Sequence, residues 1–409
     1  MQLSPVDSFL VMLSPSAHKT LLFACFWLYI TTSPALSSPP AVQPTLSYDV
    51  MRGFALWAFN SSILELPSTL EELKDLKRIG VNWVNVNFEL FQENVTSNSV
   101  ACLTCSPKTP SLNSFKTYIS KAHRLGLSIS LAPVILTPND AMINVNPSNV
   151  SEWFDSYGSV MTDVALLCEA LQVEALSVGV ELLHLSGQKD LRSHWLVLIQ
   201  TLRQVFSGKL TYHSIFLNVE LVQVSFWDAL DFIGADAYVP LQNATNVVPS
   251  QSRMLKWYLY TLQLFKDWQA AQPANVSSLP LIFTEVGYPS NNNGFLYPYN
   301  YTHPCTKDGS AKANFTVQKV AWQVVFDAIL NTSATAHRSS ESNRNQHGNY
   351  FHIPKFLVEG LFVFWMDNAA SSDYYRDRYK VNNSWACSWT PRGKPAWDVI
   401  AQGFTSYHY

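Results

Sequence analysis

A repeated alternation of short strand-like runs and longer amphipathic segments constrains the fold of this chain more than any other feature. The runs are rich in β-branched and aromatic residues, and they predict eight strands at residues 52–59, 81–88, 127–134, 174–181, 209–213, 231–238, 279–285 and 359–366. The segments between them carry apolar residues on a helical period of about 3.6 residues. This order predicts an α/β protein, a single (β/α)₈ TIM barrel with extended βα loops over residues 51–409.

A doubly wound open sheet is the alternative architecture. It is disfavoured because no G-x-G-x-x-G or P-loop motif follows any predicted strand. One helix signal is explicit: Ser68 is the expected N-cap, Glu71 completes a capping box and Gly80 ends the helix. Insertions account for the length beyond a minimal barrel, and we expect residues 331–350 to be mobile and to lie after the seventh helix, away from the functional face.

The low charge of the chain limits its partners. Only 14% of residues are charged and the net charge is -3, so the sequence offers no basic surface for nucleic acid. We expect a neutral ligand and no nucleic-acid partner.

The first residues resemble a secretory signal. His18 and Lys19 precede the apolar run 21–30, and small residues follow at 35–38. The run is shorter than the roughly 20 apolar residues that span a bilayer. We predict a signal peptide at 1–38, a short linker at 39–50 and a secreted, extracellular protein without stable membrane insertion after signal removal; an uncleaved signal anchor is the alternative.

Asn-x-Ser/Thr sequons are more frequent than composition predicts, which favours a glycosylated extracellular protein. The candidate sites are Asn60, Asn94, Asn149, Asn243, Asn275, Asn300, Asn314, Asn331 and Asn382.

Cysteine spacing agrees with an oxidising compartment. One cysteine lies in the predicted signal, which leaves five and therefore at least one free thiol. We expect a local disulfide between Cys102 and Cys105, a second between Cys305 and Cys387, and a buried thiol at Cys168. A lone C-x-x-C without neighbouring histidines does not predict a zinc site.

Two glutamates end predicted strands at matched positions. Along 174–181, side-chain alternation places Ala175, Ser177, Gly179 and Glu181 on one face, and we expect this small set to face the barrel interior. Glu285 ends the strand at 279–285. Because the fourth and seventh strands of an eight-stranded ring lie opposite each other, both carboxylates are expected at its C-terminal mouth, where barrel enzymes build their active sites.

Paired carboxylates across a ligand are what glycoside hydrolysis requires. One group protonates the leaving oxygen, and the other acts as nucleophile or base on the opposite face of the sugar. A single glutamate after a strand is more often a helix N-terminal charge or half of an ion pair, so the pair carries the prediction.

Aromatic residues near strand ends strengthen the expectation of a sugar ligand, since flat rings stack on the C–H faces of pyranoses. Tyr238 and Trp365 are the strongest candidates, whereas we expect Trp83 and Phe88 to pack in the core. The predicted substrate-binding set is Trp57, Asn85, Asn87, Asp236, Tyr238, Tyr288 and Trp365.

Together, "GVNWVNVNF", "AHRLGLSISLAPV", "VGVEL", "DFIGADAYVPL" and "FTEVGYPS" resemble glycoside hydrolase family 113, from about Met51 to Trp397. The resemblance implies a retaining β-1,4-mannanase, with Glu181 as general acid/base and Glu285 as nucleophile. It further implies that Asp236 and Tyr238 support the nucleophile or bind substrate, and that Trp365 forms an aromatic floor under the sugar.

One position departs from the wider clan, in which an asparagine precedes the acid/base and contacts the sugar 2-hydroxyl. Here that residue is Val180, and Asn85 or Asn87 are the candidates to replace the contact. The alternatives are therefore the same chemistry on a β-glucan or glucomannan, or a catalytically inactive barrel that binds glycans. We expect a polysaccharide or oligosaccharide substrate, no cofactor, no metal and a monomer.

Overall fold

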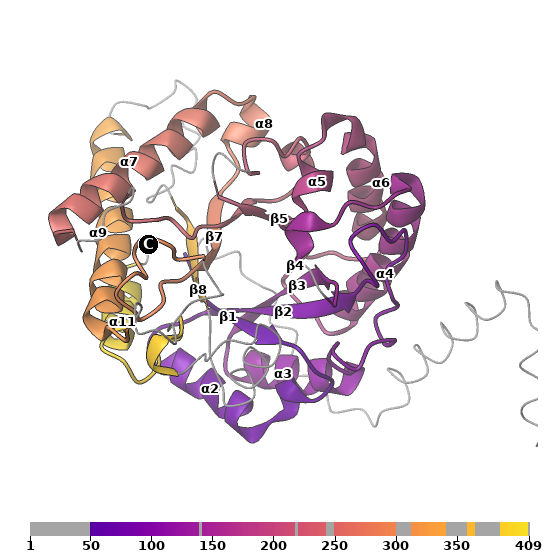
Figure 1. Ribbon diagram of the computed structural model, residues 1–409, viewed down its shortest axis with the longest axis horizontal. Helices are drawn as coiled ribbons and strands as arrows, with labels where there is room; N and C mark the ends of the chain where they lie inside the picture. Colours follow the sequence, from indigo (N-terminus) through magenta and orange to yellow (C-terminus); the bar gives the residue numbers. More distant parts are fainter. Residues whose placement is uncertain are drawn as a thin grey trace, which may run out of the picture. The chain divides into compact units, whose positions relative to one another are not determined.

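The computed structural model describes residues 50–138, 141–216, 220–242, 249–299, 312–340, 358–364 and 385–407. In this part of the chain, parallel strands form a closed barrel in the order β1 to β8, surrounded by helices (Figure 1). The strands are β1 Met51–Ala58, β2 Trp83–Phe91, β3 Ser128–Leu136, β4 Ala175–Val180, β5 Lys209–Ile215, β6 Ile233–Asp236, β7 Leu281–Val286 and β8 Gly360–Phe364. The predicted fold and all eight predicted strands are confirmed.

The helices follow the strands in sequence and cover the outside of the barrel (Figure 1). The longer ones are α2 Pro67–Arg78, α3 Leu112–Arg124, α4 Val150–Ala170, α6 Arg192–Arg203, α7 Gln251–Ala270, α9 Phe315–Ser340 and α11 Ala396–Ser406. Short turns include α5 Leu183–Ser186, α8 Ala274–Ser277 and the 3-10 segments Ile63–Glu65, Met142–Asn144, Lys189–Leu191, Trp227–Ala229 and Trp385–Cys387. Helix α9 continues into residues 331–340, which we had expected to be a mobile insertion.

The predicted capping box of α2 is wrong. The helix begins at Pro67 with Leu66 as N-cap, and no side chain caps it. Proline has a fixed φ suited to the first helical turn, so the helix starts before Ser68 can act as a cap. Glu71 instead pairs with Lys74 at 2.8 Å. Gly80 has a φ of 86°, which agrees with its predicted place after the helix end.

Large apolar side chains fill the barrel at its N-terminal end. Ala175, Phe232, Ile282 and Phe362 form a buried cluster against which Met51 and Trp83 pack. Gly53 makes room for it, since a Cβ there would lie 2.2 Å from the Phe362 ring. Phe88 is fully buried and packs edge-on against Phe115 of α3. The core roles predicted for Trp83 and Phe88 are confirmed, and the filled end leaves the other end for a site.

The cysteines behave as predicted where the structure describes them. Cys102 and Cys105 form a disulfide, and Cys168 is a buried free thiol. Burial raises the pKa of this thiol, so it stays protonated and unreactive. Cys387 is disulfide-bonded, and its expected partner, Cys305, lies outside the described residues.

The sequon asparagines within the described chain are all at least partly exposed. They are Asn60, Asn94, Asn149, Asn275 and Asn314, whereas Asn243, Asn300 and Asn382, and the side chain of Asn331, lie outside the described part. Among the helices that the structure describes, none is long and apolar enough to span a membrane.

Candidate active site

Glu285 lies near the end of β7 and faces the barrel interior beside β6. Asp236, the last residue of β6, is its register partner, and both side chains are buried, with 5% and 2% of their surface exposed. Each oxygen of the Glu285 carboxylate accepts a hydrogen bond: Asn87 Nδ2 donates to Oε1, and Tyr238 Oη donates to Oε2 at 2.7 Å. Two donors hold the carboxylate in one orientation and favour its charged form.

Asn87 is itself oriented by a polar ladder on the inner face of β2. Asn85 Nδ2 donates to Asn87 Oδ1 at 2.6 Å, and Ser130 Oγ on β3 donates to Asn85 Oδ1. Asn85 is almost fully buried, at 1% exposure, and lies one layer below Asn87. Its predicted direct contact with substrate is therefore wrong: Asn85 orients Asn87, and Asn87 orients the nucleophile candidate.

Glu181 follows β4 directly, because that strand ends at Val180. Its φ is 48°, in the left-handed region that non-glycine residues rarely adopt, and its N–H donates to the His213 carbonyl at 2.9 Å. Glu181 is partly exposed, unlike Glu285. Among the described residues no hydrogen-bond donor reaches its carboxyl, so this group is available to a ligand.

Simple alternation along β4 does not explain this placement. The register with β5 shifts between Ser177 and Val180, and a Cβ on Gly179 would lie 3.0 Å from the Tyr212 ring and 3.3 Å from Trp195 of α6. The prediction that Gly179 faces the barrel interior is therefore wrong. The irregularity in the strand and the left-handed backbone of Glu181 set the direction of the acid.

Burial and mutual repulsion separate the two glutamates in acidity. Burial raises the pKa of Glu285 to about 7, while the hydrogen bonds from Tyr238 and Asn87 hold it down. The pKa of Glu181 is raised well above its ordinary value, first by burial and then by the charges of Glu285 and Glu220. As pH rises, Glu285 therefore ionises first, and its charge keeps the proton on Glu181.

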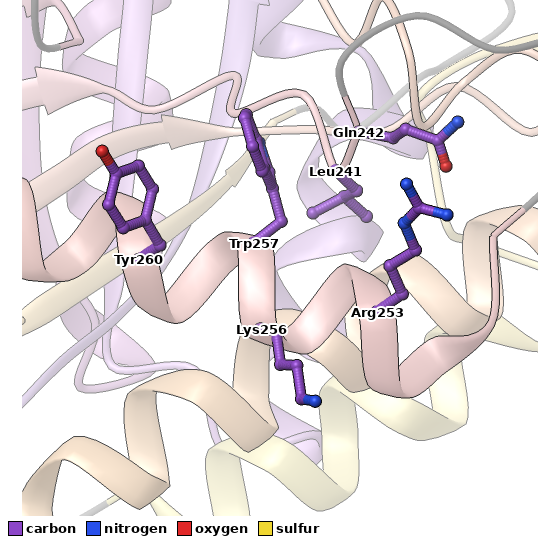
Figure 2. Close-up of a pocket in the computed structure, with 6 residues that line it drawn as sticks. All are labelled: Leu241, Gln242, Arg253, Lys256, Trp257 and Tyr260. Carbon is purple, nitrogen blue, oxygen red and sulfur yellow. The ribbon is translucent and has the colours of Figure 1, made fainter.

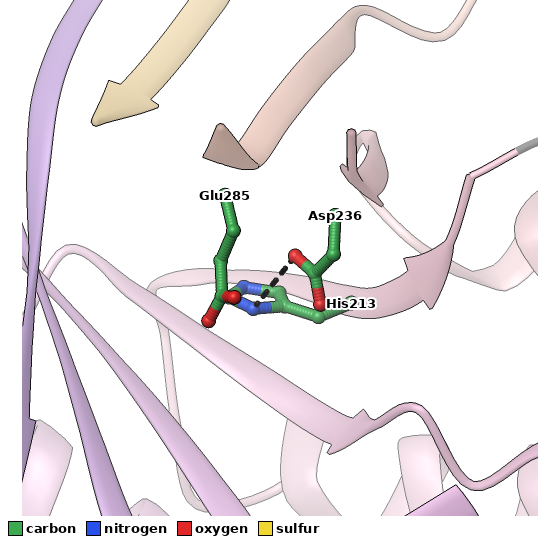
Figure 3. A group of neighbouring side chains, drawn as sticks. All are labelled: His213, Asp236 and Glu285. Carbon is green, nitrogen blue, oxygen red and sulfur yellow. Dashed lines mark ion pairs between the residues drawn. The ribbon is translucent and has the colours of Figure 1, made fainter. Parts of the chain in front are cut away.

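His213 and Asp236 lie beside the carboxylate of the nucleophile candidate (Figure 3). His213 Nδ1 is 3.9 Å from Asp236 Oδ1, and Thr284 Oγ1 donates to the same oxygen at 2.7 Å. Burial lowers the pKa of His213 to about 3, so the ring is neutral; burial and the charges of Glu285 and Glu181 raise that of Asp236. Asp236 therefore tends to keep its proton and adds little charge beside Glu285.

The same three side chains could offer ligand atoms to a metal, since one atom from each lies within 4.8 Å of the others. Both Glu285 oxygens, however, already accept hydrogen bonds. A protonated Asp236 is also a poor ligand. We therefore assign the group to the support of Glu285.

The predicted aromatic contacts divide into three cases. Tyr238 is partly exposed and donates to Glu285, and Trp57 is the register partner of Asn87, which bonds to the same carboxylate. Tyr288 is fully buried, donates to the Val239 carbonyl at 2.8 Å and packs against Trp322 of α9. Its predicted role in substrate binding is wrong. Trp365 lies outside the described residues.

Four residues of this site were absent from the sequence predictions: His213, Thr284, Tyr212 and Glu220. His213 had a detectable signal, since it is a polar residue within the predicted strand 209–213. Glu220 had none, because it lies outside any predicted strand and reaches the site only through the packing of the β5 loop.

A pocket lies between α7 and the segment after β6 that carries Leu241 and Gln242 (Figure 2). Its volume is about 440 Å³, and its lining is Leu241, Gln242, Arg253, Lys256, Trp257 and Tyr260. No carboxylate lines it, so it lacks the acid and nucleophile that hydrolysis needs. The barrel mouth remains the candidate active site.

A closed (β/α)₈ barrel with two glutamates at the ends of β4 and β7 has the paired carboxyl groups that glycoside hydrolysis requires. The sequence profile of Glycoside Hydrolase Family 113 matches residues 54–327. The chain belongs to this family and is a glycoside hydrolase.

Solved structures agree with the fold. A β-mannanase from Alicyclobacillus acidocaldarius in complex with ManMIm superposes with a TM-score of 0.65 at 19% identity, covering 88% of this chain and 98% of that one. A second family 113 β-1,4-mannanase gives a TM-score of 0.63 at 21% identity, covering 87% and 99%. No curated protein matches the sequence.

Replacing Tyr238 with phenylalanine is expected to move the acid limb of the pH dependence of kcat/KM upward by about one unit, since a hydrogen bond to a charged group is lost. The reason is that Tyr238 lowers the pKa of Glu285. Tyr288→Phe is the matched control: it removes another tyrosine hydroxyl and should lower stability by about 1 kcal/mol without moving the limb. An acid limb that stays in place in Tyr238→Phe would contradict this role.

The raised pKa of Glu285 also predicts how stability depends on pH. Between its ordinary value of 4.5 and about 7, the folded state keeps a proton that the unfolded state has released, so Glu285 makes stability fall as pH rises. Glu285→Gln should therefore stabilise the protein at pH 8 relative to pH 4, by up to about 3 kcal/mol. Urea unfolding of both proteins at both pH values measures this, and a pH-independent difference would refute it.

Proposed function

We propose that this chain is a secreted β-mannanase that hydrolyses internal β-1,4-mannosidic bonds with retention of anomeric configuration. The observation that carries the proposal is the contrast between the two glutamates. Glu285 is buried with both oxygens hydrogen-bonded, whereas Glu181 is partly exposed and no donor of the described chain reaches its carboxyl. These environments suit a charged nucleophile and a protonated acid, respectively.

In the first step, a Glu285 oxygen forms a bond to the anomeric carbon while the bond to the leaving oxygen breaks, and Glu181 gives that oxygen its proton. In the second step, Glu181 takes a proton from water, which attacks the anomeric carbon and releases Glu285. Tyr238 and Asn87 hold the nucleophile throughout. No step requires a cofactor.

The choice of mannan is supported by the names of the similar solved structures, which are β-1,4-mannanases. Val180 is buried at 2% exposure and is the register partner of His213, so it cannot supply a polar contact to the sugar 2-hydroxyl. Asn87 is fully buried and its amide is engaged by Asn85 and Glu285, so it orients the nucleophile rather than replacing this contact.

Incubation of the purified protein with mannohexaose, followed by proton NMR, tests the proposal. We expect internal cleavage and first-formed products with the β configuration. First-formed α products would overturn retention, and faster hydrolysis of a β-glucan in a polysaccharide panel would overturn the choice of mannan. Binding without hydrolysis would indicate an inactive glycan-binding barrel.

Secretion and glycosylation form a separate part of the proposal, together with a signal peptide at 1–38, a linker at 39–50 and a monomeric catalytic domain from residue 51. Expression of the full chain in a eukaryotic host should release a protein that begins near residue 39 and loses mass on enzymatic removal of N-glycans. Retention of the protein in the membrane fraction with its first residues intact would favour the signal anchor instead.

A further inference from the structure

The backbone of Glu181 needs support from its surroundings. A φ of 48° places this residue in the left-handed region, which costs a non-glycine residue on the order of 1–3 kcal/mol. Such a conformation persists only where neighbouring contacts hold it. On the preceding side, the Glu181 N–H donates to the His213 carbonyl at 2.9 Å.

On the following side, Tyr212 of β5 holds the next peptide group. The Leu182 N–H donates to Tyr212 Oη at 2.7 Å, and this is the first amide after Glu181. The Tyr212 ring is fully buried and packs against Trp195 and Phe226, with ring centroids 5.6 and 5.5 Å away. Gly179 allows the ring to lie this close to β4, since a Cβ there would come within 3.0 Å of it.

Glu220 accepts hydrogen bonds from the Tyr212 hydroxyl and from Ser186, at the end of the turn that follows Glu181. Tyr212 Oη donates to Glu220 Oε1 at 2.5 Å, Ser186 Oγ donates to the same oxygen, and the Ile215 N–H donates to Oε2 at 2.8 Å. The Tyr212 hydroxyl therefore binds Leu182, and the Glu220 carboxylate binds Ser186. These residues are the two ends of the turn that follows Glu181.

Burying the Glu220 carboxylate is unfavourable, since the residue is 0% exposed. Its three hydrogen bonds offset this cost, because the Tyr212 hydroxyl, the Ser186 hydroxyl and the Ile215 N–H would have no acceptor beside an apolar residue. Glu220 is therefore the common acceptor that holds the turn after the acid.

We infer that Tyr212 and Glu220 are positioning residues for the acid/base: Glu220 orients the Tyr212 hydroxyl, which holds the Leu182 amide and so keeps Glu181 in its left-handed conformation with its carboxyl at the barrel mouth. This inference rests on the role proposed for Glu181. Neither residue touches the substrate.

Tyr212→Phe tests the inference, because it keeps the ring and removes the hydroxyl. A poorly placed acid slows hydrolysis of substrates whose leaving group must be protonated. It has little effect on the hydrolysis of substrates whose leaving group departs without a proton. We expect kcat/KM for an unsubstituted phenyl β-mannobioside to fall about 100-fold, the lower end of what general acid catalysis contributes. The value for the 2,4-dinitrophenyl β-mannobioside should change little.

Tyr157→Phe is the matched control. Tyr157 is also a fully buried tyrosine whose hydroxyl bonds to β4, donating to the Val178 carbonyl at 3.0 Å, but on the strand before the acid. It should lose stability without a change in the ratio of the two substrates. If Tyr212→Phe leaves this ratio at the wild-type value in an active enzyme, the inference is overturned.

A crystal structure of each variant separates this inference from the proposed function. If the wild-type protein hydrolyses neither substrate, the proposed function fails and the backbone of Glu181 decides the inference alone. The inference predicts that the backbone of Glu181 leaves the left-handed region in Tyr212→Phe and stays there in Tyr157→Phe. An unchanged Glu181 in Tyr212→Phe would overturn it.

Discussion

Glu285→Gln is expected to lower kcat on β-mannan by at least about 10⁴-fold, a loss typical of removing a catalytic nucleophile. Glutamine keeps the size of the side chain and can still accept from Tyr238 or Asn87, but it cannot form the glycosyl ester. The fold should persist, because the substitution relieves a buried charge whose pKa is already raised to about 7. A reducing-sugar assay with circular dichroism of the same sample measures both.

Glu152→Gln is the matched control for this variant. Glu152 lies exposed in the first turn of α4, so its replacement should leave kcat within about twofold of wild type, as surface changes usually do. Near-normal activity of Glu285→Gln would remove Glu285 from the role of nucleophile. Equal losses in both variants would point to damaged folding rather than chemistry.

Glu181→Ala should show the second large effect. Hydrolysis of a phenyl β-mannobioside is expected to fall by about 10²–10⁴-fold, because no other group protonates the leaving oxygen. The raised pKa of Glu181 also sets the basic limb of the pH dependence, so this limb should disappear in the variant. Steady-state kinetics across pH measure both changes.

Azide provides an independent readout for Glu181→Ala. A small anion can enter the space left by the side chain and attack the glycosyl enzyme without needing a general base. We expect azide to speed turnover of the dinitrophenyl substrate and to give a β-mannobiosyl azide. An α-mannobiosyl azide, or no azide product together with a retained basic limb, would contradict the acid/base role.

The strands, and the place of Glu285 near the end of one of them, could be predicted from local pattern. β-Branched runs separated by amphipathic segments repeat along the chain, and this periodicity depends only on neighbouring residues. The inward direction of Glu285 does not follow from alternation, because Ile282 already faces the interior and alternation would turn residue 285 outward. A register shift between β6 and β7 makes Glu285 the partner of Asp236 and turns it inward. The disulfide between Cys102 and Cys105 was predictable, because the partners are three residues apart.

Glu181 shows where local pattern fails. Its strand was predicted one residue too long at each end, and Gly179 was assigned to the wrong face. The register shift in β4 arises from its pairing with β5, which is more than 25 residues further along the chain by the numbering. Alternation cannot reveal such a shift, since it assumes an unbroken strand.

The sequence by itself determined the barrel, the order of its strands and the two acids that end the fourth and seventh of them. Only the tertiary structure showed that Asn87 donates to Glu285 and that Tyr212, itself bonded to Glu220, accepts from the amide that follows Glu181. It also showed that Tyr288 packs in the core and donates to Val239. The physical reason is distance along the chain. Periodicity records which face a residue prefers, whereas pKa and orientation depend on hydrogen bonds and charges brought together by folding from strands far apart in sequence.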